Sequence, residues 1–162
     1  MNGSNLVINN YGLFTHHENG KPIWKNPENA RRVAKFLKYL FMDEKEIKYA
    51  AQKETINEAA KYFLNLGTGM VIVTQGSRGS MVFTKDKEYK IPAFKPKKMM
   101  DTTGAGDTYL AGFIFATQLF DDIQKQGKFA AMVATMGIEK DGAFTGNLKE
   151  VGKRLKSENI NL

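Results

Sequence analysis

The sequence predicts an α/β domain in which a mostly parallel sheet is flanked by helices. Residues 70–74 are a continuous apolar run rich in β-branched residues, which is typical of a strand covered on both faces. Apolar residues recur at helical spacing on both sides of this run. Polar residues 85–87 separate two short strand patterns and predict a hairpin. Helices, a buried strand, a hairpin and further helices together favour a layered α/β architecture.

The beginning of the chain is predicted to hold a strand and a loop. Residues 6–8 are apolar and predict a short buried strand. The polar residues 15–26 predict a loop, because Gly20 and Pro22 interrupt regular structure. Two adjacent histidines in this segment have no third ligand at metal-binding spacing, so an exposed loop is favoured over a metal site.

A helix is predicted to begin at Asn26, with Asn26 as its N-cap and Pro27 at its first position. Apolar residues continue at helical spacing from Ala30 to Leu40. Residues 40–42 also have the composition of a short buried strand.

Two capping boxes predict the next two helices. Asp43 precedes Glu46 by three residues, and Thr55 precedes Glu58 by the same spacing. The second of these helices is expected to stop at Gly67 and Gly69, since glycine adopts the left-handed conformation that ends helices.

Three helices are predicted in the last third of the chain. The first begins within residues 101–107, the pair Asp121-Asp122 caps the second, and Asn147 opens a capping box for the third. Gly142 is expected to break the second helix. The residues expected to face inward on the first two helices are Leu110, Phe113, Ile114, Thr117, Phe129, Met132, Val133 and Met136.

The stretch Asp101-Thr102-Thr103-Gly104-Ala105-Gly106-Asp107 carries the strongest chemical signal. Its small residues let backbone N–H groups approach a ligand closely, and the helix that follows favours an anion at its first turn. A carboxylate in that turn can accept a proton from a hydroxyl group. Each residue alone is more often an ordinary turn or helix-start residue, but the combination indicates phosphoryl transfer to an alcohol.

The complete seven-residue string resembles the signature of the ribokinase-like (PfkB) carbohydrate kinases. The resemblance implies that Gly104, Ala105 and Gly106 stabilise charge on the transferring phosphoryl group. It also implies that Asp107 is the catalytic base. The family fold is a three-layer sandwich, in which helices cover both faces of the sheet, and this chain is expected to hold part of it.

A second glycine-containing segment follows the predicted strand at residues 70–74. On its own, a Gly-x-x-Gly segment after a strand is most often a turn. This segment resembles a nucleotide-binding segment of the same family, and Gly76 stands 25 residues before Asp101. The resemblance implies that the nucleotide contacts the following residues: Thr74, Gly76, Gly79, Thr103 and Ala131.

Asp43 and Glu46 have two compatible interpretations. Their spacing is that of a capping box, which is structural. The family carries an N-x-x-E motif at this point, with a glutamate that organises Mg²⁺, so the resemblance makes Glu46 the better metal ligand. Asp43 stands where the family has Asn, and this departure offers a second negative charge near the metal. The resemblance therefore implies ATP and Mg²⁺ as cofactors, and leaves potassium dependence open.

We expect residues 1–162 to form a single domain. The resemblance covers most of this chain, but it corresponds only to the nucleotide-binding, C-terminal part of a family member. The segments that hold most of the sugar-binding groups are not recognisable. We therefore expect an ATP-dependent kinase of a small sugar or related alcohol that is incomplete as this chain. The alternative is a non-catalytic nucleotide-binding or interaction domain. In either case we expect a homo-oligomer or pairing with a missing N-terminal half.

Composition limits the remaining function classes. The chain has 24 Lys and Arg against 17 Asp and Glu, a net charge of +7 that attracts polyanions. No nucleic-acid-binding signature and no P-loop motif accompanies this charge, so we expect no nucleic-acid partner. No apolar run approaches the length of a membrane span. The absence of cysteine and of a signal-like pattern favours a cytoplasmic protein without a membrane partner.

Overall fold

The structure is a computed structural model that describes residues 7–9, 15–18 and 21–160, with side chains from residue 23 onward. Its strands are β1 (Val7–Asn9), β2 (Thr15–Glu18), β3 (Lys21–Trp24), β4 (Tyr39–Asp43), β5 (Met70–Thr74), β6 (Ser80–Phe83) and β7 (Glu88–Ile91). Its helices are α1 (Glu28–Val33), α2 (Glu44–Ala51), α3 (Ile56–Asn65), α4 (Ala105–Ala116), α5 (Ile123–Gly137) and α6 (Leu148–Ser157), with 3₁₀ turns at Ala34–Phe36 and Gly76–Arg78.

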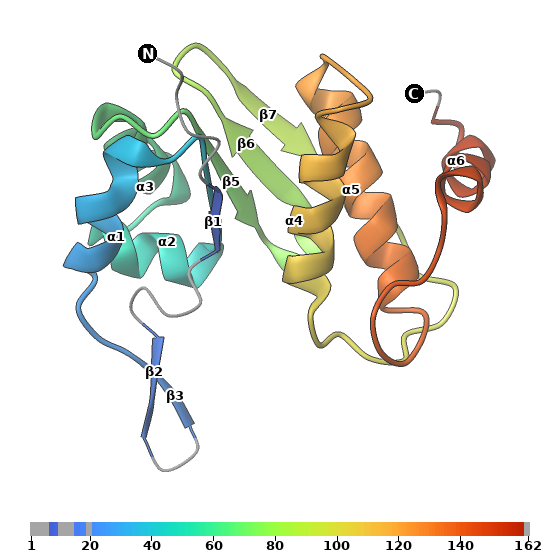
Figure 1. The fold of residues 1–162 in the computed structure, drawn as a ribbon, viewed down its shortest axis with the longest axis horizontal. Coiled ribbons are helices and arrows are strands. Elements are labelled where there is room, and N and C mark those ends of the chain that lie inside the picture. The colour runs from blue at the N-terminus through green and yellow to red at the C-terminus, as the bar shows by residue number, and fades with distance from the viewer. Residues whose placement is uncertain (1–6, 10–14, 19–20, 161–162) are drawn as a thin grey trace. The chain divides into compact units, whose positions relative to one another are not determined.

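The main sheet has five strands in the order β1-β4-β5-β6-β7 (Figure 1). β1, β4 and β5 are parallel, and the register places Asp43 opposite Thr74 where β4 and β5 end. The buried run predicted at residues 70–74 is therefore a central strand, as its composition indicated. The predicted α/β class, a mostly parallel sheet with flanking helices, is confirmed.

The chain contains two compact units, which we describe separately. Unit 1 consists of residues 1–74 and 81–88. Within it, α2 and α3 pack against each other, α2 packs against β4, and α3 packs against β5. The largest fully buried side chains of this core are Leu40, Met42, Ile47, Phe63, Val71 and Val73. The expectation of a single domain over residues 1–162 stays a prediction.

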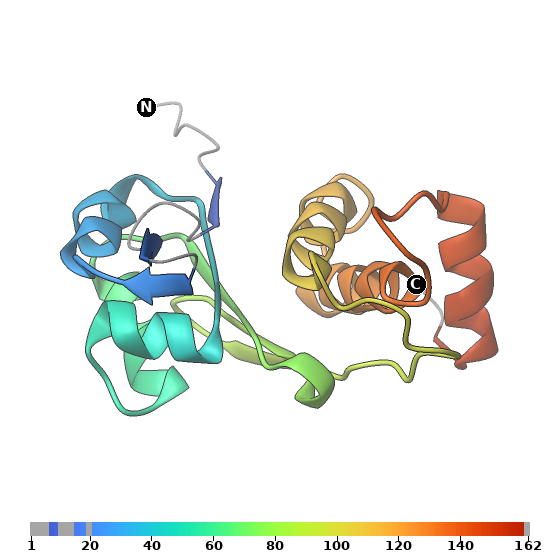
Figure 2. The same cartoon turned by 90° about the horizontal axis from the view of Figure 1, so that it is seen from below.

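Unit 2 consists of residues 75–80 and 89–162. α4 and α5 pack side by side, and α6 packs against α5 (Figure 2, yellow to red). Gly112 permits the close approach of α4 to α5, because a Cβ there would lie 3.2 Å from the Ala130 Cα. The core of this unit includes Phe113, Ala116, Phe129, Met132, Val133, Val151 and Leu155.

Both predicted capping boxes are present in unit 1. The Asp43 side chain accepts a hydrogen bond from the Glu46 N–H, and the Glu46 side chain accepts one from the Asp43 N–H. Thr55 and Glu58 make the same pair of bonds at the start of α3. In unit 2, Asp122 caps α5, and the Asn147 side chain accepts from the Glu150 N–H at the start of α6. These starts were predictable because each depends on residues three positions apart.

The prediction of a loop over residues 15–26 was wrong. β2 and β3 form an antiparallel hairpin there, with His17 opposite Pro22. Polar residues can form such a ribbon because backbone pairing does not require apolar side chains. Pro22 is tolerated because both strands of a two-stranded ribbon are edge strands. Of the strand predicted at residues 6–8, Leu6 lies outside the described residues.

The helix expected from Asn26 to Leu40 was also partly wrong. Asn26 has a left-handed φ of 55°, so it is not an N-cap, and its carbonyl accepts from the Asn29 N–H. The helix becomes 3₁₀ at Ala34 and the chain is extended at Leu37, because the following residues join the sheet as β4.

The inward face predicted for α4 was shifted. Tyr109, Gly112, Phe113 and Ala116 are its buried residues, whereas Leu110, Ile114 and Thr117 are only partly buried. Since α4 is apolar on nearly every face, helical periodicity could not identify the side that meets α5. On α5, burial of Phe129, Met132 and Val133 confirms the prediction, and Met136 is partly buried.

Candidate functional site

The start of α4 is an open, glycine-lined turn. Gly104 is the N-cap residue and has a φ of 71°, a left-handed conformation that favours glycine. A Cβ at Gly104 would meet no atom within 4 Å, so this position faces open space. The Ala105 N–H donates to the Thr102 carbonyl at 3.2 Å, and the Thr108 N–H donates to the Gly104 carbonyl at 2.8 Å. Ala105 and Gly106 follow in the first turn, where helices offer N–H groups to an anion.

Asp101 organises the segment that leads into this turn. Its Oδ1 accepts a hydrogen bond from the Thr103 N–H at 2.8 Å. The backbone bond from Thr103, together with a side-chain bond from the same residue, holds the pKa of Asp101 below its usual range. The carboxylate therefore folds back over its own loop and fixes the approach to Gly104.

Asp107 lies in the first turn of α4, and its side chain is exposed. Thr103 and Gly104 are exposed as well, and Ala105 and Gly106 are partly buried. The predicted proton acceptor and the predicted anion-binding turn therefore share one accessible helix start. A carboxylate in this position can accept a proton from a hydroxyl group brought to it.

The turn after β5 contains two glycines in different surroundings. Gly76 has a φ of 59°, and a Cβ there would meet nothing within 4 Å. Gly79 has a φ of 95°, and a Cβ there would overlap the Ile91 carbonyl oxygen. The Gln75 N–H donates to the Gly79 carbonyl at 2.8 Å and closes the turn. Gly76 is thus open to a ligand, whereas close packing accounts for glycine at position 79.

A buried pair of hydroxyl groups links this turn to α4 within unit 2. Ser80, which directly follows Gly79, places its Oγ 2.7 Å from the Tyr109 Oη. Burial raises the pKa of Tyr109 to about 12, an effect that the hydrogen bond to Ser80 partly offsets. Tyr109 was not among the residues expected to face inward on this helix. A tyrosine in a helix core was the available signal, since its hydroxyl group needs a partner when buried.

The predicted metal ligands lie in unit 1, beside Thr74 at the carboxyl ends of two parallel strands. The Asp43 N–H donates to Glu46 Oε2 at 2.6 Å, and the Glu46 N–H donates to Asp43 Oδ1 at 2.8 Å. Each carboxylate thus caps α2 through one of its two oxygens. Among the residues that the structure describes, no group of three or more His, Cys, Asp or Glu forms a metal cluster. A pair of carboxylates suits Mg²⁺, which takes one or two carboxylates and completes its shell with water and substrate phosphates.

Ala131 lies on α5 and is 7% exposed. Its carbonyl accepts a hydrogen bond from Thr135 Oγ1 at 2.8 Å. Packing within unit 2 therefore accounts for a small residue at this position, and the contact with adenine stays a prediction.

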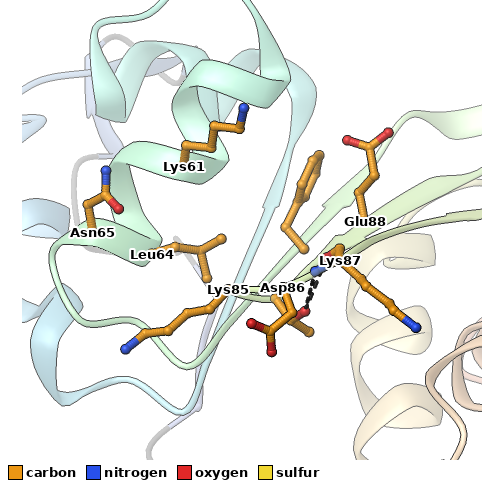
Figure 3. A pocket seen from close by; sticks show the side chains of 9 residues that line it. Lys61, Leu64, Asn65, Lys85, Asp86, Lys87 and Glu88 are labelled. Atoms are coloured by element: carbon orange, nitrogen blue, oxygen red, sulfur yellow. Dashed lines mark hydrogen bonds between the residues drawn. The ribbon is translucent and has the colours of Figure 1, made fainter.

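A groove in unit 1, about 600 Å³ in volume, contains none of the predicted site residues (Figure 3). It lies between α3 and the β6–β7 hairpin, and its lining includes Leu64 and lysine side chains from both elements. Lys61 comes from the helix, and Lys85 and Lys87 come from the hairpin turn. Acidic Asp86 and Glu88 line the same groove, so its charge is mixed.

No helix within the described part of the chain is long and apolar enough to cross a membrane.

The chain is similar to kinases of known family in both sequence and fold. The sequence model described as pfkB family carbohydrate kinase matches residues 15–150. A nucleoside kinase from Methanocaldococcus jannaschii is 35% identical over 135 residues, which are 82% of this chain and 44% of that protein. A crystal structure of the same nucleoside kinase superposes with a TM-score of 0.71 at 32% identity, covering 82% of this chain and 44% of the other.

Two further relatives support the same assignment of fold. A ribokinase from Lactococcus lactis is 34% identical over 151 residues, covering 90% of this chain and 49% of that protein. The crystal structure of a Vibrio cholerae fructokinase with fructose, ADP and calcium has a TM-score of 0.69 at 22% identity, covering 78% of this chain and 44% of the other, and supports the fold alone. This chain spans about half the length of the curated relatives it matches.

Proposed function

Because the chain belongs to the pfkB family of carbohydrate kinases, we propose that it carries the nucleotide-binding and proton-accepting part of an ATP-dependent kinase. The acceptor is a hydroxyl group of a small sugar or a nucleoside-like alcohol. The observation that carries this proposal is the exposed Asp107 in the first turn of α4, directly after the open Gly104 turn.

The proposed reaction transfers the γ-phosphoryl group of ATP to the acceptor oxygen. The P–O bond to ADP breaks, a P–O bond to the acceptor forms, and the acceptor proton goes to the Asp107 carboxylate. Backbone N–H groups at Gly104, Ala105 and Gly106 stabilise the negative charge on the phosphoryl oxygens, and the Ala105 N–H shares its donation with the Thr102 carbonyl. Such donors act from fixed positions, so they need no rearrangement as charge develops.

The nucleotide is proposed to lie along the turn after β5, with Thr74 and Gly76 toward its phosphates and ribose and Thr103 toward its phosphates. Support for Gly76 comes from its open surroundings, whereas Gly79 has a packing role in any case. Glu46 and Asp43 are the proposed magnesium ligands. When bound, Mg²⁺ would neutralise charge on the phosphates.

The lack of cysteine favours a cytoplasmic setting.

The second candidate is a non-catalytic nucleotide-binding or interaction domain. The observation that favours it is that the chain matches less than half of each relative's length: 44% of the nucleoside kinase and 49% of the ribokinase. A kinase must also position the acceptor and exclude water from the phosphoryl group. We propose that the isolated chain binds nucleotide weakly and turns over slowly.

Asp107→Asn tests the catalytic proposal. We expect it to lower acceptor-dependent ADP release by about 10²- to 10⁴-fold, because it removes the proton acceptor while keeping the size of the side chain. Calorimetry with Mg·ATP should show little change in affinity. The measurement is a coupled ADP assay with ribose, fructose and a panel of nucleosides, with and without potassium.

Asp122→Asn is the matched control, because it changes an acid at another helix start of unit 2 and asparagine also caps helices. Turnover of Asp107→Asn at the wild-type rate would refute the role of Asp107. Nucleotide binding without any turnover favours the binding domain, and absence of nucleotide binding overturns both candidates.

A further inference from the structure

Two segments proposed to contact one nucleotide lie far apart in sequence and are joined by a buried hydrogen bond. Ser80 follows the turn at residues 76–79, and Tyr109 lies two residues after Asp107. Ser80 is 3% exposed and Tyr109 is 5% exposed, with 2.7 Å between their hydroxyl oxygens. Both residues belong to unit 2, so this bond lies within a single compact unit.

Close packing and backbone hydrogen bonds of Gly79 hold Ser80, the residue that follows it, in place. Gly79 packs so closely on β7 that a Cβ would overlap the Ile91 carbonyl oxygen. Its N–H donates to the Gly76 carbonyl at 3.0 Å, and its carbonyl accepts from the Gln75 N–H at 2.8 Å. A displacement of Ser80 would therefore be transmitted to the turn that presents Gly76.

Packing against a buried aromatic ring holds the Tyr109 side chain in place. The Tyr109 ring stacks on Phe113, with 6.3 Å between ring centroids and an interplanar angle of 16°. Phe113 is fully buried in unit 2. Tyr109 stands about one helical turn after the start of α4, so its position sets where the first-turn N–H groups and Asp107 lie.

An apolar pair would fill this space without the need to satisfy two buried hydroxyl groups. Burying a hydroxyl group costs free energy unless the group makes a hydrogen bond. Because the bond between Ser80 and Tyr109 mainly offsets this cost, it adds little net stability, but it is made only when the two side chains lie at one particular spacing. We propose that Ser80 and Tyr109 are positioning residues that hold the Gly76 turn and the start of α4 at the spacing required by one bound nucleotide. This inference rests on the function proposed above.

The test is a double-mutant cycle of Tyr109→Phe, Ser80→Ala and the combined variant. Calorimetry with Mg·ATP gives the affinities well below each unfolding temperature, and urea denaturation gives the stabilities. We expect each single variant to weaken affinity by about 3- to 10-fold, because either change removes the link. The combined variant should bind about as weakly as the single variants, since the same interaction is lost only once.

Tyr89→Phe is the control, because it removes a tyrosine hydroxyl group from β7 in the same unit. Its affinity should equal that of the wild type. If a single variant fails to fold, the combined variant decides, since it contains neither of the two hydroxyl groups.

Two negative outcomes are distinguishable. Variants that are less stable but bind Mg·ATP as the wild type does would show a purely structural hydrogen bond and overturn this inference alone. A wild-type protein that binds no Mg·ATP would overturn the proposed function and the nucleotide-positioning role together.

Discussion

At the scale of single residues, the two glycines of the turn after β5 illustrate different reasons for the same residue type. Gly76 combines a φ of 59° with open surroundings, so a side chain there would be strained but would not collide. Gly79 combines a φ of 95° with contact to the Ile91 carbonyl, so a side chain would be both strained and obstructed. Sequence spacing treats the two as equivalent, and only their surroundings separate them.

The two alanine variants should differ in stability. We expect Gly79→Ala to lower the free energy of unfolding by roughly 2–5 kcal/mol, because backbone strain and overpacking add. Gly76→Ala should cost roughly 1–2 kcal/mol, from strain alone. Urea denaturation of both variants measures the difference. Equal losses would contradict the close packing of Gly79 against β7.

At the scale of secondary-structure elements, α2 and α3 begin with equivalent capping boxes but differ in their proposed roles. Asp43 and Glu46 cap α2 beside Thr74, at the carboxyl ends of β4 and β5. Thr55 and Glu58 cap α3, and the hydroxyl group of Thr55 holds the pKa of Glu58 below its usual value. The chain thus offers an internal control for the metal proposal.

Glu46→Gln and Glu58→Gln separate capping from metal binding. Glutamine still accepts the backbone N–H of the N-cap residue, so each variant should keep most of the stability that its capping box provides. Only Glu46→Gln removes a proposed magnesium ligand, and we expect it to weaken binding of Mg·ATP by about tenfold. Calorimetry with and without Mg²⁺ checks this. Equal affinities of the two variants would contradict a metal role for Glu46.

At the scale of the whole molecule, the chain has exposed apolar side chains and matches only part of the length of its relatives. Among residues 23–160, whose side chains the structure describes, the exposed large apolar residues are Phe36, Met99, Met100, Phe115, Leu119 and Leu148. Two of them, Phe115 and Leu119, stand four residues apart on the last part of α4 and just beyond its end. Because residues four apart lie on one side of a helical turn, Phe115 and Leu119 together offer apolar surface to another protein, whereas singly exposed apolar residues do not.

We expect this chain to associate with itself when isolated, in a concentration-dependent manner. Replacing Phe115 by Ser together with Leu119 by Lys should shift the equilibrium toward the monomer, because it removes apolar surface and adds charge. Sedimentation velocity over a range of concentrations measures the shift. Lys125→Gln, an exposed change on α5, should leave association unchanged. A monodisperse monomer at every concentration would contradict the expectation.

Much of the local structure was predictable from short-range patterns. The capping residues Asp43, Thr55 and Asn147 were identified, and Asp122 was identified as one of the pair Asp121-Asp122, because a cap needs only a side chain and an N–H group three residues later. The buried strand β5 was identified from its composition. The hairpin β2–β3 was missed because its polar residues form strands through backbone pairing, which leaves no apolar alternation to detect.

The candidate site was predictable in part. The glycine-rich start of α4 and Asp107 are contiguous in sequence, so their proximity followed from the motif itself. The different surroundings of Gly76 and Gly79 and the burial of Ala131 could not be predicted, because each depends on elements far along the chain.

The sequence by itself determined the kinase family, most helix starts and the acid beside the glycine-lined turn at Gly104, because these depend on residues within a few positions of one another. The tertiary structure alone decided the bond between Ser80 and Tyr109 and the alignment of Asp43 with Thr74. The physical reason is that a hydrogen bond or strand register between distant residues depends on how the intervening elements pack, which local propensity does not specify.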